Sequence, residues 1–254
     1  NQFDEAERGW YLQMMARFIF PLSKAESQSY QKAAFLVNYE LIRPIDDIKY
    51  SKIPVHNEKQ SAQIKKAITA KGGIEEFLLY LNETLSNFTL GVNSDSFEEA
   101  VDTIGKTLGF ECQRPDKTIK KGPDNLWYVG NNRYILIECK SEATTEFISK
   151  TVAGQCEEHC AWFEKEYPNS ESMNIIVCHT NKLDDAAYFS HQYYIMRKND
   201  IFKLSANIRA FFREFIGKDI EGVGDATVSQ WLNLHKLNYS DFITNYLIEP
   251  RKSK

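Results

Sequence analysis

The chain of 254 residues is expected to adopt a mixed α/β (α+β) fold, in which a small mixed sheet is flanked by helices. Two short apolar runs, Ile135–Ile137 and Asn174–His179, predict strands that are covered on both faces. Apolar residues at helical spacing occur before, between and after these runs. The pattern predicts a helical module over residues 1–90, a sheet-bearing domain over residues 91–216 and a helical tail over residues 217–254.

The first ninety residues show helical patterns separated by breakers. Pro21, Pro44 and Gly72–Gly73 end successive segments, and the polar stretch 44–60 is expected to be a long loop. These aromatic-rich helices are expected to form a core, or an interface with another domain, rather than a ligand pocket. The positions that define them are Trp10, Met14 and Phe18; Tyr30, Ala33, Ala34, Val37 and Leu41; Ile64, Ala67 and Ile68; and Ile74, Phe77, Leu78, Leu81, Leu85 and Phe88.

The sheet-bearing domain begins with a helix that Ser94 or Asp95 is expected to cap. Gly109 ends this helix, and a long later helix stops before Pro168. The order of helices and strands predicts a sheet packed between helices. The expected helices span 97–108, about 145–166 and 201–215, and the expected strands span 110–113, 124–129, 133–140, 174–179 and 193–196.

A predicted hairpin brings two acidic residues together. Gly130–Asn132 is a turn between two runs rich in β-branched and aromatic residues. With a three-residue turn, Asp124 faces Glu138, and Lys140 lies on the same face because side chains alternate along a strand. With a two-residue turn, Asn125 faces Glu138 instead and Asp124 turns to the other face.

Opposed carboxylates repel unless a cation or a proton lies between them. Asp124, Glu138 and Lys140 are therefore the residue types expected around a hard divalent cation with an activated water. Two simpler interpretations stand beside this one. Asp124 is also an ordinary residue after a proline in a turn, and Lys140 is also a salt-bridge partner for Glu138.

Residues from about 91 to 216 resemble the PD-(D/E)XK nuclease superfamily. The resemblance lies in Pro123–Asp124, in Glu138–Cys139–Lys140, in the helix that contains Phe97–Glu98–Glu99 and in Gln155 on the long helix. It implies a restriction-endonuclease-like fold and a Mg²⁺- or Mn²⁺-dependent endonuclease that hydrolyses phosphodiester bonds, with DNA as the expected substrate and RNA as the alternative.

The resemblance also implies roles for single residues. Asp124, Glu138 and the backbone carbonyl of Cys139 would bind the metal, and Glu98, or its neighbour Glu99, would complete the shell. Lys140 would hold and help deprotonate the attacking water. Gln155 would orient the substrate backbone or Lys140. In some members a tyrosine follows this glutamine by one helical turn, whereas this chain has His159 there.

The charge pattern leaves the mode of nucleic-acid binding open. A net charge of −4 argues against a wholly basic nucleic-acid binder but allows a local basic groove. A basic stretch is either a solvated loop or a phosphate-binding loop beside the metal site; it contains Lys117, Lys120 and Lys121. The alternative function is a catalytically inactive, nuclease-like domain that binds nucleic acid or acts as a scaffold.

Further expectations concern partners and setting. The expected partners are nucleic acid, a second copy of the chain, and a larger ATPase or helicase partner or parent chain; the resemblance alone adds prokaryotic defence as a context. The start at Asn1 is consistent with a fragment.

Five cysteines without a disulfide pattern suggest a reducing, cytoplasmic setting, and no apolar run predicts a membrane span. Cys156 and Cys160 are expected to pack in the core rather than to bind zinc together with His159, and His179 and His191 are expected to be incidental.

Overall fold

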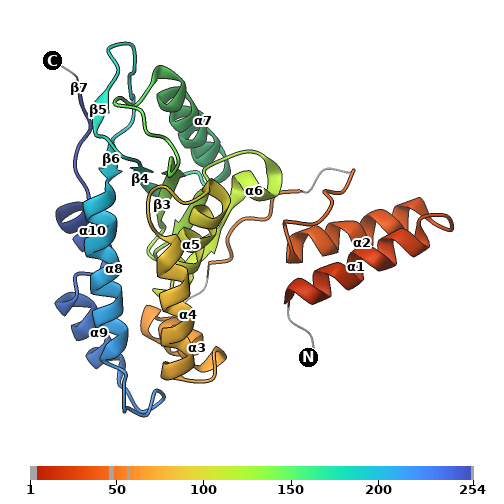
Figure 1. The fold of residues 1–254 in the computed structure, drawn as a ribbon, viewed down its shortest axis with the longest axis horizontal. Helices are drawn as coiled ribbons and strands as arrows, with labels where there is room; N and C mark the ends of the chain where they lie inside the picture. Colours follow the sequence, from red (N-terminus) through yellow and green to blue (C-terminus); the bar gives the residue numbers. More distant parts are fainter. Residues whose placement is uncertain (1–4, 46–48, 56–57, 253–254) are drawn as a thin grey trace. The chain divides into compact units, whose positions relative to one another are not determined.

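The computed structural model describes residues 5–45, 49–55 and 58–252. The chain forms two compact units, the first from Asn1–Ser51 and Pro115–Lys121, and the second from Lys52–Arg114 and Gly122–Lys254 (Figure 1). The predicted mixed α/β class, with a mixed sheet flanked by helices, is confirmed. Among the described residues, none of the helices combines the length and the apolar character that crossing a bilayer requires.

The first unit is built on a helical hairpin. Helix α1 (Glu5–Ile19) packs along α2 (Lys24–Val37), and Ser23 caps α2 by accepting a hydrogen bond from the backbone N–H of Glu26. Both helices were predicted. The segment expected to be a basic loop instead begins with a short helix, α6 (Pro115–Ile119), because proline is favourable at the first position of a helix.

The second unit contains the remaining helices, and their predicted positions are confirmed with two differences. Helix α5 is capped by Asn93 rather than by Ser94 or Asp95. Helix α7 begins at Lys150 rather than near Thr145, because Ser149 caps it and Ile148 forms a β-bridge with Leu183. The helices are α3 (Gln60–Ala70), α4 (Ile74–Asn87), α5 (Ser94–Thr107), α7 (Lys150–Glu166), α8 (Lys198–Arg213), α9 (Asp225–Leu234) and α10 (Tyr239–Tyr246).

Within the described residues the main sheet has five strands in the order β1-β2-β3-β4-β6. The first three strands are antiparallel neighbours, whereas β3, β4 and β6 run parallel. The tail is not wholly helical, because β7 (Arg251–Lys252) pairs with β5 (Lys182–Leu183). The strands of the main sheet are β1 (Glu111–Gln113), β2 (Asn125–Tyr128), β3 (Arg133–Cys139), β4 (Glu171–Val177) and β6 (Tyr193–Met196).

Each face of the sheet has its own helical cover. On one face, Trp127, Ile135 and Ile137 belong to a continuous apolar cluster that includes residues of α3, α4, α5, α8, α9 and α10. On the other face, the ring of Tyr134 contacts Phe163 of α7, with 5.2 Å between ring centroids. Strand β3 is therefore buried on both sides, as its run of apolar residues predicted.

Candidate active site

The hairpin of β2 and β3 has the predicted three-residue turn. Asn131 and Asn132 adopt left-handed backbone conformations, with φ of 53° and 57°, which asparagine tolerates better than most residues. The N–H of Val129 donates to the carbonyl of Arg133 at 3.0 Å. Leu126 consequently pairs with Leu136, so the predicted register is confirmed.

Asp124 lies directly before β2 and extends the hairpin with its side chain. Its Oδ2 accepts a hydrogen bond of 2.7 Å from the backbone N–H of Cys139. The alternative with Asn125 opposite Glu138 is wrong, because Asn125 pairs with Ile137. The Asn125 amide instead donates to the carbonyl of Glu98 at 3.1 Å, which ties the hairpin to α5.

Glu138 is buried between two basic groups. Its Oε1 lies 2.7 Å from Lys140 Nζ, and its Oε2 lies 2.9 Å from His159 Nδ1 on α7. The Glu138 side chain is only 6% exposed, whereas that of Lys140 is 26% exposed. The salt bridge between Lys140 and Glu138 that was predicted as one interpretation is confirmed.

The two carboxyl groups of the site, Glu138 and Asp124, have pKa shifts in opposite directions. Burial favours the neutral form of Glu138, but the hydrogen bond to His159 and the charge of Lys140 outweigh it and lower the Glu138 pKa. Burial, together with the charges of Glu138 and Glu98, raises the pKa of Asp124 to about 8. In the metal-free protein the site therefore favours the charged form of Glu138 over the charged form of Asp124.

Lys140 remains charged in this setting. Burial favours its neutral form, but the charge of Glu138 and the hydrogen bond to it outweigh burial and raise the Lys140 pKa. Lys140 is therefore an ammonium donor rather than a free base in this arrangement. Its role as a base would require Glu138 to be neutralised by another cation.

Glu98 approaches the site from α5. Its charge contributes to the raised pKa of Asp124, whereas Glu99 is exposed. Glu98 Oε2 lies 2.7 Å from Arg114 Nη2, and the same nitrogen lies 2.8 Å from Asp95 Oδ1. Arg114 is buried, and its ion pairs with Glu98 and Asp95 hold the start of α5 against the end of β1.

The other predicted site residues are less closely engaged. Gln155 lies on an exposed part of α7, one helical turn before His159. The three lysines of the predicted basic loop belong to the first unit. Lys117 pairs with Glu40 at 3.2 Å, Lys120 lies 3.8 Å from Asp116, and Lys121 is exposed.

Comparison with known proteins does not assign the chain to a family. No protein-family model, curated protein or solved structure matches this chain. What the chain does has to be inferred from its own residues.

A divalent cation fits part of this arrangement. Within the described ranges, no three His, Cys, Asp or Glu side chains converge as a metal-binding group. Mg²⁺, however, usually keeps several waters and takes only one or two carboxylates from the protein. Asp124 and Glu138 supply that number, and burial together with the charges of Glu138 and Glu98 raises the pKa of Asp124, which a bound cation would oppose. Glu138 already has two basic partners, so a metal would compete with Lys140 and His159 for its oxygens.

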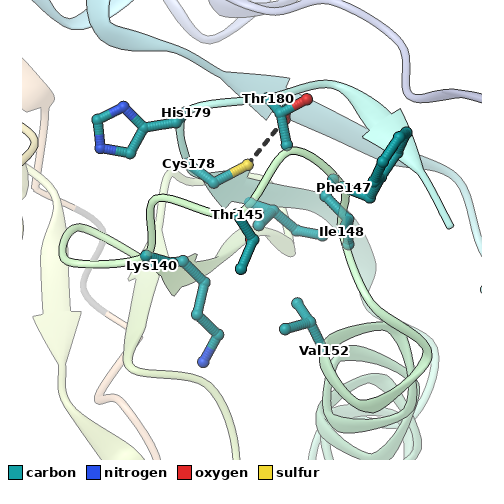
Figure 2. A pocket seen from close by; sticks show the side chains of 10 residues that line it. Lys140, Thr145, Phe147, Ile148, Val152, Cys178, His179 and Thr180 are labelled. Atoms are coloured by element: carbon teal, nitrogen blue, oxygen red, sulfur yellow. Dashed lines mark hydrogen bonds between the residues drawn. The ribbon is translucent and has the colours of Figure 1, made fainter.

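A small hollow lies beside Lys140, at the carboxyl ends of β3 and β4. Figure 2 shows the side chains of Lys140 and Val152 in this hollow. Its volume is about 20 Å³, which is enough for roughly one water molecule. A nucleotide does not fit inside, so a substrate would have to lie across the surface. The residues that line it are Lys140, Ala143, Thr145, Phe147, Ile148, Val152, Ile176, Cys178, His179 and Thr180.

Sequence reasoning missed two partners in this site, His159 and Arg114. His159 lies on the same face of α7 as Cys156, three residues earlier, and this spacing was the available signal. Arg114 follows β1 directly, but its pairing with Glu98 depends on how α5 crosses the sheet. Cys156 and Cys160 are buried, which confirms the expectation that they pack in the core.

His191, which was expected to be incidental to function, has a structural role in ion pairs with α7. Its Nδ1 lies 2.8 Å from Glu157 and its Nε2 lies 3.1 Å from Glu164, and both acids are on α7. The hydroxyl of Ser190 also contacts the Glu157 carboxylate. These contacts attach the segment before β6 to the outer side of α7.

Proposed function

We propose that the chain is a Mg²⁺- or Mn²⁺-dependent nuclease that hydrolyses phosphodiester bonds in DNA. The observation that carries this proposal is the placement of Asp124 beside Glu138, with Lys140 in contact with Glu138. The resemblance to the PD-(D/E)XK superfamily over about residues 91–216 supports the same assignment, because these residues are the ones that form its motif.

In this proposal the side chains divide the work. Asp124 and Glu138 would hold the cation together with the Cys139 carbonyl, and Glu98 would complete its shell from α5. When bound, the cation acts as a Lewis acid and lowers the pKa of a coordinated water. Lys140, released from Glu138, holds the attacking water or stabilises charge on the phosphate. His159 fixes the orientation of the Glu138 carboxylate, and Gln155 positions the substrate backbone.

The test is cleavage of plasmid, linear DNA and RNA in Mg²⁺ or Mn²⁺, with and without a chelator. We expect chelator-sensitive cutting of DNA by the natural chain and loss of cutting in Lys140→Ala. Lys66→Ala is the matched control, because Lys66 forms an ion pair with Glu58 in which both side chains are exposed. Cutting that survives Lys140→Ala would contradict the assigned site.

A second candidate function is a catalytically inactive, nuclease-like domain that binds nucleic acid or acts as a scaffold. The specific observation in its favour is that Glu138 already has Lys140 and His159 as partners without a metal. Calorimetry with Mn²⁺ separates the two functions. Binding that disappears in Asp124→Ala supports the nuclease, whereas DNA binding without Mn²⁺ binding or cleavage supports the inactive domain.

A further inference from the structure

Helix α1 carries an apolar stripe on the side that faces away from α2. Gly9 and Ala16 lie against α2 and are buried. The opposite side holds five large side chains whose exposed fractions lie between 45% and 72%. Their spacing of three and four residues places them on one face of the helix. We call this face the α1 stripe, and its members are Trp10, Tyr11, Met14, Met15 and Phe18.

The contact between α1 and α2 buries few apolar side chains and does not cover the α1 stripe. The buried contacts between α1 and α2 are partly polar: Ser27 Oγ donates to the carbonyl of Ala16, and Gln31 Nε2 donates to Gln13 Oε1. The buried apolar side chains of residues 5–45 are few, and two of the four are alanines, namely Ala16, Ala34, Phe35 and Leu41. Units of this size usually need oligomerisation or another source of stability.

The area of the stripe matches what a stable dimer needs. An aromatic side chain can bury about 150–250 Å². With the exposed fractions above, the stripe offers roughly 500–600 Å² of apolar surface per copy. A standard interface takes about 800 Å² from each partner, of which somewhat more than half is apolar.

The charges on α1 favour an antiparallel arrangement of two copies. Glu7 lies near the start of the helix and Arg17 near its end, and both are exposed. A parallel pair would set like charges beside each other, whereas an antiparallel pair brings Glu7 of one copy towards Arg17 of the other. The helix dipoles also oppose each other favourably in that arrangement.

The second unit offers no comparable surface among its described residues. Its exposed large apolar side chains lie singly on separate elements, such as Leu79 on α4, Phe202 on α8 and Leu234 on α9. Single exposed side chains of this kind are normal on a monomer. The α1 stripe, in contrast, is self-complementary, as a two-fold interface requires.

We infer that the α1 stripe is the contact by which two copies of this chain associate, with the two α1 helices packed antiparallel against each other and each α2 on the outer side of its own α1. This inference does not depend on the proposed nuclease activity. In a nuclease the association would supply a second active site for the second strand of a duplex.

The test is sedimentation of the full chain over a range of concentrations. We expect a dimer, and we expect Phe18→Glu to raise its dissociation constant at least about tenfold, because it places a charge on the apolar stripe, where Phe18 has the largest exposed fraction, 72%. Leu79→Glu is the matched control, since Leu79 is 73% exposed on α4 and outside the stripe. It should leave the dimer unchanged.

Circular dichroism verifies that both variants fold. Met14→Cys gives a second readout, because an antiparallel pair that crosses near Met14 should form a disulfide-linked dimer on mild oxidation. A monomer at every concentration would overturn the inference, and so would a dimer that Phe18→Glu does not weaken. Binding to lipid vesicles without dimerisation would assign the stripe to a membrane surface and also overturn it.

Discussion

Glu138 is neutralised by two basic partners, whereas the neighbouring Asp124 is held neutral by its own proton. Both states follow from burial, because a carboxylate removed from water must either be paired or remain protonated. The difference lies in what surrounds each group: Lys140 and His159 contact Glu138, while the charges of two other acids, Glu138 and Glu98, act on Asp124 more strongly than the charge of Lys140 does. An acid kept in this state lowers stability and is common at functional sites.

Asp124→Asn should stabilise the metal-free protein. The ordinary pKa of 3.8 rises to about 8 on folding, so ionisation of Asp124 opposes the folded state. This cost is absent below the ordinary pKa, grows as the pH rises and is complete above about 8. We therefore expect the gain in unfolding free energy to be larger by about 1 kcal/mol or more at about pH 8.5 than at about pH 5.

Urea unfolding of the two proteins with a chelator present measures this difference at both pH values. Asparagine retains a side-chain oxygen that can accept the hydrogen bond from Cys139 N–H. A gain that is the same at the two pH values would show that Asp124 is already ionised in the folded protein.

His159→Ala should destabilise the protein by about 1–3 kcal/mol, because it removes a partner from the buried Glu138 carboxylate. His179 is exposed and serves as the control; His179→Ala should change stability by less than about 0.5 kcal/mol. Urea unfolding at neutral pH measures both variants. Equal effects would show that His159 contributes little to holding Glu138.

At the scale of the elements, the sheet is positioned by close packing of α5. An ideal Cβ on Gly105 would lie 2.5 Å from Cys112 Sγ and 2.6 Å from Trp127 Cε2. Only a glycine allows the helix this close to β1 and β2. Since α5 also carries Glu98, this spacing sets how near the third acid comes to Asp124.

Gly105→Ala should lower the unfolding free energy by about 1–3 kcal/mol, because buried sulfur and indole atoms have to move. Gly154→Ala provides the matched control on α7, where an added Cβ meets nothing within 4 Å. It should be neutral or stabilising by up to about 1 kcal/mol, since alanine favours helix. Thermal or urea unfolding compares the two, and a harmless Gly105→Ala would contradict the close packing.

The ion pairs of His191 with Glu157 and Glu164 on α7 should make the unfolding free energy depend on pH. Hydrogen bonding to Glu157 raises the His191 pKa above its ordinary 6.5, against the opposing effect of burial and with further help from Glu164. Folding therefore favours the charged form. Its contribution is complete below the ordinary pKa and is lost as the pH rises through the folded value.

We expect His191→Gln to destabilise the protein more at about pH 5.5 than at about pH 8.5. Unfolding free energies of the variant and the natural chain at the two pH values measure the effect. A difference that grows with pH would have the wrong sign for this ion pair.

The elements and the hairpin register could be predicted from the sequence, whereas several contacts between elements could not. The alternation of side chains along β2 and β3, together with the Gly-Asn-Asn turn, predicted that Leu126 pairs with Leu136, as the structure shows. These signals are local. The late start of α7 depends on the bridge from Ile148 to Leu183, and the pairing of His159 with Glu138 depends on how α7 lies on the sheet. Both are tertiary contacts, which periodicity does not encode.

At the scale of the whole molecule, the two units differ in how they are stabilised. The second unit has a continuous apolar cluster that runs from α3 to α10 and includes one face of the sheet. The first unit relies on a small, partly polar helix contact. Local stability follows the number of buried apolar contacts, so the two units should open at different free energies.

Hydrogen exchange should therefore be faster in α1 and α2 than in β3 and β4 at low protein concentration. Higher concentration should slow exchange in α1 and α2 and leave β3 and β4 unchanged, because dimerisation stabilises only the segments that it covers. Mass spectrometry of peptides from 5–37, 133–139 and 171–177 measures both effects. Exchange in α1 that does not respond to concentration would contradict association through this helix.

The hydrogen bond from Cys139 N–H to Asp124 gives one side chain two separate reasons to be retained. Its oxygen takes the place of a main-chain carbonyl at the end of the hairpin ladder, so Asp124 preserves the strand pairing whether or not any reaction takes place. If the chain is the nuclease proposed above, a homologue without the activity would be expected to keep this aspartate for the strand pairing and to differ at Lys140 instead.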